Sequence, residues 1–235
     1  MVTETRQIRP HGVEALDNRD LDNVVAETMM GEIALTNVLF GGNAAVKFGL
    51  LQLMRGICSS GPLSILDVGA GGGEVVSRAC GLLGEQRTHP VALDHHRTSA
   101  HMCSARGVTP IVGDLRQLPL GPASIDIAIV SLVLHHVTRT EAVALVAQLD
   151  AVARLGVVIA DLRRSTLARI GFDLAGRILR LHEGTRRDGL LSIQRGFTVA
   201  ELNGIITDAG VTDATVRRRP GWRVVAYWRT NHEDN

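Results

Sequence analysis

Apolar residues follow two different spacings along the chain, and the spacing changes near residue 60. Before that point they recur every three to four positions over Leu21–Phe40 and Ala44–Ile57, on either side of Gly41-Gly42-Asn43. This spacing predicts two amphipathic helices. After Ser59-Ser60-Gly61-Pro62, short continuous apolar runs alternate with helix-length segments. Continuous runs of this kind are typical of parallel strands that are buried on both faces.

The alternating part of the chain predicts a βαβ series. Its strands are expected at Leu63–Val68, Pro90–Leu93, Thr109–Val112, Ile125–Leu132 and Gly156–Ala160, and its helices at Glu74–Leu83, Thr98–Arg106 and Glu141–Val152. Such a series favours a doubly wound sheet with right-handed crossovers.

The last third of the chain begins with Ser165–His182, whose apolar stripe predicts a long helix. Glu183–Gly196 is polar and is expected to be irregular. Beyond it the sequence predicts a helix capped by Thr198 and two strands, Ala214–Val216 and Arg223–Trp228.

Composition narrows the class of protein. The 235 residues are 45% hydrophobic and 21% charged, with a net charge of +1, which favours a soluble globular protein and gives no overall attraction to nucleic acid. The cysteines lack CxxC spacing, and the polar N-terminus does not resemble a signal peptide, so we expect a cytoplasmic protein. No run approaches the ~20 apolar residues of a membrane span. Only 3% of the residues are aromatic, which predicts largely aliphatic pockets.

The most informative segment is Ile65–Glu74, a buried strand that runs into a glycine-rich turn and then a helix. Glycines at this place let a ligand approach the main chain at the carboxyl edge of the sheet. A dinucleotide fingerprint would need glycine where Glu74 stands, and the acids Asp67 and Glu74 disfavour a pyrophosphate. They favour a cofactor that carries an ammonium group and a sulfonium centre.

From about Leu63 to Ile159 the chain resembles class I S-adenosylmethionine-dependent methyltransferases. The resemblance rests on Asp67–Gly73, on Val91–Asp94 after the second strand, and on Val112–Leu115 after the third. It implies a glycine turn along the methionine part of the cofactor, an acid on the ribose hydroxyls and an acid on the adenine amino group. The residues that it assigns to the cofactor are Asp67, Gly69, Ala70, Gly71, Gly73, Asp94, His95, Gly113, Asp114, Leu115 and Ser131.

The fourth predicted strand runs into Ser131-Leu132-Val133-Leu134-His135-His136, which resembles the small-molecule branch of this family, including quinone-biosynthetic enzymes. The chain also looks like bacterial methyltransferases that are encoded beside type III polyketide synthases. The Asn-Pro-Pro-Tyr tetrad of enzymes that methylate amide or base nitrogens is missing. His135 and His136 are candidate bases because histidine titrates near neutrality, or else they fix the start of the next helix.

The region after the fifth strand resembles an insertion that covers the methyl acceptor. Arg163, Arg186 and Arg187 are candidates to meet an acidic group of that acceptor, and each has the alternative of a surface salt bridge. No metal is predicted.

The expected fold is a Rossmann-like α/β sheet of seven strands in the order 3-2-1-4-5-7-6, with the last strand antiparallel. Residues 1–60 are expected to form a helical lid, and residues 61–235 the methyltransferase domain. The expected reaction is methyl transfer from S-adenosylmethionine to an oxygen or carbon of a small hydrophobic acceptor of secondary metabolism. No nucleic acid partner is expected, and a homodimer is left open. The alternatives are an NAD-dependent oxidoreductase and a catalytically silent S-adenosylmethionine-binding module.

Overall fold

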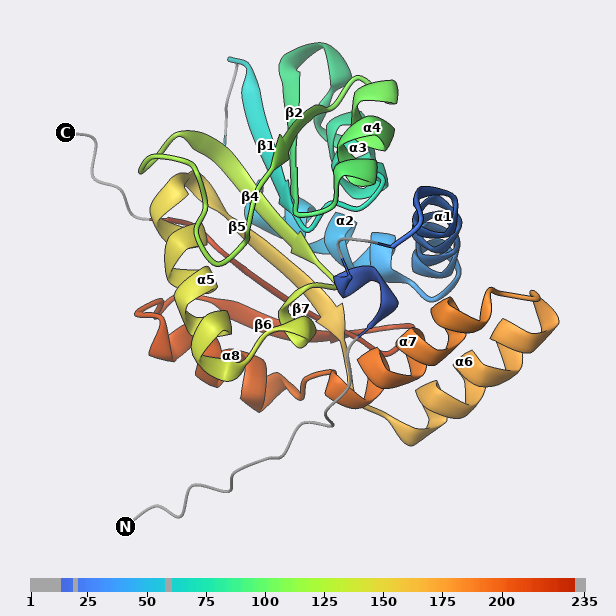
Figure 1. The fold of residues 1–235 in the computed structure, drawn as a ribbon. Helices are drawn as coiled ribbons and strands as arrows, with labels where there is room; N and C mark the ends of the chain where they lie inside the picture. The colour runs from blue at the N-terminus through green and yellow to red at the C-terminus, as the bar shows by residue number, and fades with distance from the viewer. Residues whose placement is uncertain (1–13, 19–20, 58–60, 231–235) are drawn as a thin grey trace.

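The computed structural model describes residues 14–18, 21–57 and 61–230 of the chain (Figure 1). The first part of the predicted lid, residues 1–13, lies outside the described residues.

One seven-stranded sheet organises the molecule, in the order β3-β2-β1-β4-β5-β7-β6. The strands β1 to β5 are parallel, and β7 is antiparallel to both of its neighbours, which confirms the predicted topology. The strands are β1 Leu63–Val68, β2 Thr88–Asp94, β3 Thr109–Val112, β4 Ile125–Ser131, β5 Ala153–Leu162, β6 Thr215–Arg219 and β7 Arg223–Trp228.

Helices cover both faces of the sheet, and two further helices extend from its carboxyl edge (Figure 1). The α-helices are α1 Asn23–Leu39, α2 Gly42–Leu53, α3 Glu74–Leu83, α4 Arg97–Ala105, α5 Arg139–Val152, α6 Thr166–Ile178, α7 Glu183–Arg195 and α8 Val199–Asp208. Short 3-10 turns are η1 Ala15–Asp17, η2 Glu85–Arg87 and η3 Leu134–His136.

Two apolar cores lie on opposite faces of the sheet. One contains buried side chains of α5 and α8, such as Leu145 and Leu202, and the other contains side chains of α2, α3 and α4. The central strand β4 is buried along its whole length, as its continuous apolar sequence predicts.

The two N-terminal helices differ in their packing. α2 belongs to the core, and it lies so close to β5 that a Cβ atom on Gly49 would come within 2.5 Å of the Val158 side chain. In contrast, α1 lies beside α4 and α7 at the carboxyl edge of the sheet. No single helix in the described ranges has the length and apolar composition to cross a bilayer, and α1 and α2 reach that length only as a pair bent by 65°.

The segment Glu183–Gly196, expected to be irregular, forms helix α7 and a one-residue cap. The prediction failed because the face that α7 buries is polar, with Thr185, Asp188 and Ser192 among its buried residues. A polar buried face leaves no apolar periodicity in the sequence. α7 packs against α6, whose opposite side leaves Leu167 and Leu174 exposed.

Candidate functional site

The turn between β1 and α3, residues Gly69–Gly73, is held open by glycine conformations. Gly69 and Gly71 have φ angles of 73° and 54°, in the left-handed region that other residues avoid. A Cβ atom on Gly69 would also lie 2.4 Å from a methyl group of Val133. The amides of Gly69 and Ala70 donate to the Leu93 carbonyl at 2.7 and 3.2 Å, which fixes this glycine turn beside the end of β2. Gly73 does not line the cavity at this turn and instead precedes α3.

Asp94 ends β2 and faces the glycine turn. One carboxylate oxygen accepts from the Gly71 amide and the other from the His96 amide, both at 2.9 Å. The partly exposed His95 ring places its Nδ1 atom 3.5 Å from the same carboxylate. The predicted acid and its neighbour therefore line the cavity together with the turn.

Asp67 is a buried carboxyl at the floor of the glycine turn. Neither of its oxygens has a hydrogen-bond partner among the described residues. Burial first, and the charge of Asp94 second, raise the pKa of Asp67 to about 8, and the nearby Val76 amide, whose geometry falls short of a hydrogen bond, offsets only part of the shift. A buried carboxyl in this state fits a ligand that brings a positive charge.

The segment after β3, the third of the predicted cofactor segments, lies beside Asp94. Gly113, Asp114 and Leu115 line a pocket that shares Asp94 with the main cavity. The Gly113 amide donates to the Asp94 carbonyl at 2.9 Å, and Asp114 accepts from the Arg116 amide at 2.9 Å. Three segments far apart in the sequence thus line two adjoining pockets that share Asp94.

At the end of β4 the chain turns sharply into the other half of the cavity. The Ser131 hydroxyl is buried, and its oxygen has no hydrogen-bond partner among the described residues. Leu132 has a φ angle of 59°, a strained value for a leucine, and its amide donates to the Ala160 carbonyl. This turn leads into η3, which carries both histidines.

His135 forms a buried pair with Asp161, the acid near the end of β5. Its Nδ1 atom lies 2.6 Å from a carboxylate oxygen of Asp161, and both side chains are almost fully buried. Burial alone would raise the pKa of Asp161, but the charge and hydrogen bond of His135 and the Leu162 amide lower it below its ordinary value. Asp161 is therefore ionised and orients the His135 ring.

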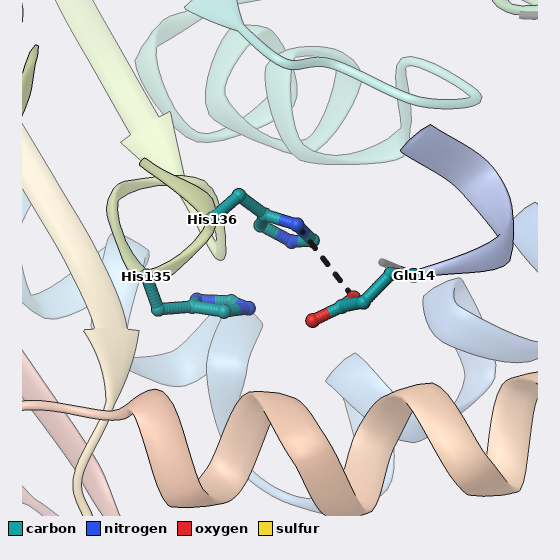
Figure 2. Close-up of side chains that lie close together, drawn as sticks. All are labelled: Glu14, His135 and His136. Carbon is teal, nitrogen blue, oxygen red and sulfur yellow. Dashed lines mark ion pairs between the residues drawn. The ribbon is translucent and has the colours of Figure 1, made fainter. Parts of the chain in front are cut away.

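Glu14 faces the two histidine rings from the N-terminal segment (Figure 2). The rings stack with centroids 4.3 Å apart, and His136 Nδ1 lies 3.6 Å from the Glu14 carboxylate. Ser192 donates to the other Glu14 oxygen at 2.8 Å, and the Arg195 guanidinium reaches it at 3.2 Å. Ligand atoms of Glu14, His135 and His136 lie within 4.8 Å of one another, a donor set that could hold a metal ion. Arg195 already balances the charge of Glu14, which disfavours a second cation.

Apolar side chains form another part of the cavity. We call this part the apolar chamber, and its walls are Met30, Ile33, Phe40, Ala168, Phe172 and Trp222. The rings of Phe40 and Phe172 lie 5.9 Å apart, so aromatic residues gather here despite their scarcity. The apolar lining of the whole cavity is mostly aliphatic, as expected, and its aromatic side chains are concentrated in this chamber.

The structure separates the three predicted arginines. Arg163 lines the cavity, whereas Arg186 lies 3.6 Å from Asp173 and Arg187 is exposed, and neither of these two lines it. Arg223, which was not predicted as a site residue, is buried and lines the same cavity. A signal was present, because Arg223 is the one charged residue in the otherwise apolar strand β7.

Comparisons with known proteins agree with this geometry. Residues 65–156 match the family model described as a methyltransferase domain. No curated protein matches the chain.

Solved structures share the fold at low sequence identity. A SAM-dependent methyltransferase from Aquifex aeolicus is 15% identical, with a TM-score of 0.55 over 77% of this chain and 89% of that one. Magnesium protoporphyrin IX methyltransferase from Synechocystis, with bound SAH, is 17% identical, with a TM-score of 0.55 over 81% and 84%. Human N-acetylserotonin methyltransferase, in complex with SAM, is 14% identical, with a TM-score of 0.62 over 90% and 57%. The domain match over residues 65–156 supports a methyltransferase that uses S-adenosylmethionine, and the solved structures support the fold.

Proposed function

We propose that this protein transfers a methyl group from S-adenosylmethionine to an oxygen, or to a carbon, of a small hydrophobic acceptor. Phenolic, quinoid and polyketide-type metabolites are the classes that we favour, in a cytoplasmic role in secondary metabolism. The observation that carries the proposal is the continuity of one cavity, which joins the glycine turn and Asp94 to Ser131, His135 and the apolar chamber. A cofactor and an acceptor bound there would meet in a largely dry space.

The residues of the glycine turn would hold the cofactor. Asp94 has the chemistry and position to accept from ribose hydroxyls, and Asp67 to pair with the cationic amino-acid part. When bound, S-adenosylmethionine supplies a methyl group on a positively charged sulfur. Transfer of such a group depends mainly on alignment and on the exclusion of water.

His135 is the base in this proposal. Its Nδ1–H donates to the ionised Asp161, so the lone pair lies on Nε2, the atom left to take a proton from a hydroxyl or an acidic carbon of the acceptor. Asp161 then stabilises the imidazolium that forms, and acts as a positioning residue. His136 packs its ring against that of His135 and is more exposed, so we assign it a supporting role.

The N-terminal segment contributes a cap in this proposal. Glu14 and α1 residues such as Met30 line the cavity opposite η3, whereas α2 packs in the core. We therefore limit the cap to η1 and α1, within the region 1–60 that the sequence analysis assigned to a lid.

The two alternatives differ from this proposal in what they bind and turn over. The methyltransferase-domain match favours S-adenosylmethionine over NAD. A silent binding module would keep cofactor affinity without turnover.

Calorimetric titration with S-adenosylhomocysteine tests the cofactor half of the proposal. We expect saturable binding that weakens about 100-fold in Asp94→Ala, because hydrogen bonds to a charged group are worth about 1.5–3 kcal/mol each. The exposed Asp213→Ala is the matched control and should bind normally. No saturable binding to the wild type contradicts the proposal.

Transfer of labelled methyl groups to a panel of phenols, hydroquinones and polyketide acids tests the other half. Labelled product supports the proposal, whereas binding of S-adenosylhomocysteine with no turnover on any member of the panel favours the silent module.

A further inference from the structure

Arg223 is a buried cation that forms no ion pair with a described acid. Its side chain belongs to a residue only 5% exposed, at the first position of β7. In the described part of the chain, its guanidinium makes one hydrogen bond, from Nη1 to the Gly221 carbonyl at 3.2 Å, and no ion pair. Its Nε atom is buried without a hydrogen-bond partner. The edge of the guanidinium formed by Nε and Nη2 is thus left for another group.

The charge on Arg223 survives this burial. Burial lowers the pKa of Arg223 to about 10, and the charge of Asp161 opposes the shift. The side chain is therefore still protonated at neutral pH. A buried charge that forms no ion pair destabilises the folded protein, and a bound counter-charge would relieve that cost.

Arg163 is a second arginine that lines the cavity, and its backbone lies beside the turn that carries Arg223. Leu162 of β5 pairs with Arg223 of β7, and the next amide, that of Arg163, donates to the Trp222 carbonyl at 2.8 Å. The Nε atom of Arg163 is also buried without a hydrogen-bond partner among the described residues, and both arginines line the cavity.

The turn that carries Arg223 is fixed in place. Trp222 has a φ angle of 54°, and a Cβ atom on Gly221 would lie 2.1 Å from the Phe40 carbonyl oxygen. A strained residue beside a close backbone contact marks a position that the surrounding structure determines. Arg223 is therefore held at the cavity by the fold.

The acids at this end of the cavity are engaged elsewhere. Asp161 pairs with His135, Glu14 is bonded by Ser192 and Arg195, and Asp188 accepts from the Ala15 amide at 2.7 Å. None of them forms an ion pair with Arg163 or Arg223 in the described ranges. Asp161 acts on Arg223 through its charge without forming an ion pair, so a direct anionic partner for either arginine would have to come from a bound molecule.

We propose that the methyl acceptor carries a carboxylate, and that Arg223 and Arg163 bind it beside the apolar chamber. The inference rests on the proposed function and names the substrate class of the same site. A guanidinium offers two parallel N–H donors that match the two oxygens of a carboxylate. The apolar chamber takes the rest of the molecule, so the acceptor is an amphipathic organic acid.

Calorimetry in the presence of saturating S-adenosylhomocysteine tests this inference. The probes are salicylate, 4-hydroxybenzoate and decanoate, each compared with its own methyl ester. For at least one pair we expect the wild type to bind the acid at least tenfold more tightly than the ester. This preference should disappear in Arg223→Met and persist in Arg218→Met, an exposed arginine on the same hairpin.

Thermal unfolding of the ligand-free protein supplies an independent readout. Arg223→Met should raise the melting temperature, because a side chain of similar length replaces a buried charge that forms no ion pair. The wild type, and not this variant, should gain stability from the acid that it binds. If Arg223→Met does not fold, Arg223→Lys and Arg163→Met decide, and each should lose most of the preference for the acid.

The outcomes separate this inference from the proposed function. No binding of S-adenosylhomocysteine to the wild type overturns both. Normal binding of S-adenosylhomocysteine with no acid preferred over its ester, or with a preference that survives in Arg223→Met or in the two substitute variants, overturns only the carboxylate site.

Discussion

The two ends of the cavity are built in different ways. At the cofactor end, Asp67, the glycine turn and Asp94 come from the carboxyl ends of adjacent parallel strands and from the turns that follow them. At the acceptor end, the groups come from the N-terminal segment, η3, α7 and the β6–β7 hairpin. For example, the hydrogen bond from Ser192 to Glu14 joins residues that are 178 positions apart in the sequence.

This difference explains which end a sequence can predict. A strand followed by a glycine-rich turn places its acid at the sheet edge through local geometry, which the fold supplies automatically. The acceptor end depends on which distant segments pack together. The cofactor end is also acidic, with two carboxylates near each other, whereas at the acceptor end Arg163 and Arg223 form no ion pair with any acid of the described residues.

The largest effect should come from His135→Gln, which removes the proposed base but leaves the cofactor end intact. We expect kcat to fall by roughly 10² to 10⁴, the usual contribution of a general base, with unchanged affinity for S-adenosylhomocysteine. Steady-state kinetics and calorimetry measure the two quantities. His136→Gln is the comparison variant, and a larger loss there would reverse the assignment of the two histidines.

Gly69→Ala tests the cofactor end through its backbone. The left-handed φ angle costs about 1–2 kcal/mol for alanine, and the contact with Val133 adds about 1–3 kcal/mol. The free energy of unfolding from denaturant titration should fall by about that sum. The second change Val133→Ala should recover the part due to the contact, and no recovery would show that the φ angle alone matters.

Asp67→Asn tests the charge of the cofactor end through pH. The pKa of Asp67 is about 8 in the folded protein, above its ordinary 3.8, so its favourable contribution is complete below about pH 4 and is lost as the pH rises toward 8. Without ligand, the free energy of unfolding of Asp67→Asn, relative to that of the wild type, should therefore increase by up to about 1.4 kcal/mol per pH unit in that window. Denaturant titrations at pH 5, 6.5 and 8 measure it, and a constant difference would contradict the raised pKa.

Glu14→Gln should have the smallest effect. The amide keeps a hydrogen-bond acceptor for Ser192 but removes the charge beside Arg195 and His136. We expect a several-fold loss in kcat/KM with normal cofactor affinity, because the loss corresponds to about 1 kcal/mol. An equal loss in S-adenosylhomocysteine affinity would mean that the N-terminal segment serves both ends.

Particular residues show how far the sequence could lead. The strand order and the meeting of Asp67, Asp94 and Asp114 at one edge followed from continuous apolar runs that end in acids or glycines. Helix α7 was not predicted because its buried face is polar. Arg223 was not predicted because the lack of a partner for its Nε atom depends on the packing around it. Neither polar burial nor a missing partner leaves a periodic pattern along a chain.

The place of Trp222 in the apolar chamber has a practical consequence. The chain has two tryptophans, and the other, Trp228, is 3% exposed in the core, with its indole N–H bonded to Asp150 at 2.7 Å. An acceptor that enters the apolar chamber will therefore change the environment of one indole and leave the second as an internal reference. Intrinsic tryptophan fluorescence should therefore report acceptor binding. Candidate acceptors can be screened in this way without attaching a label to the protein.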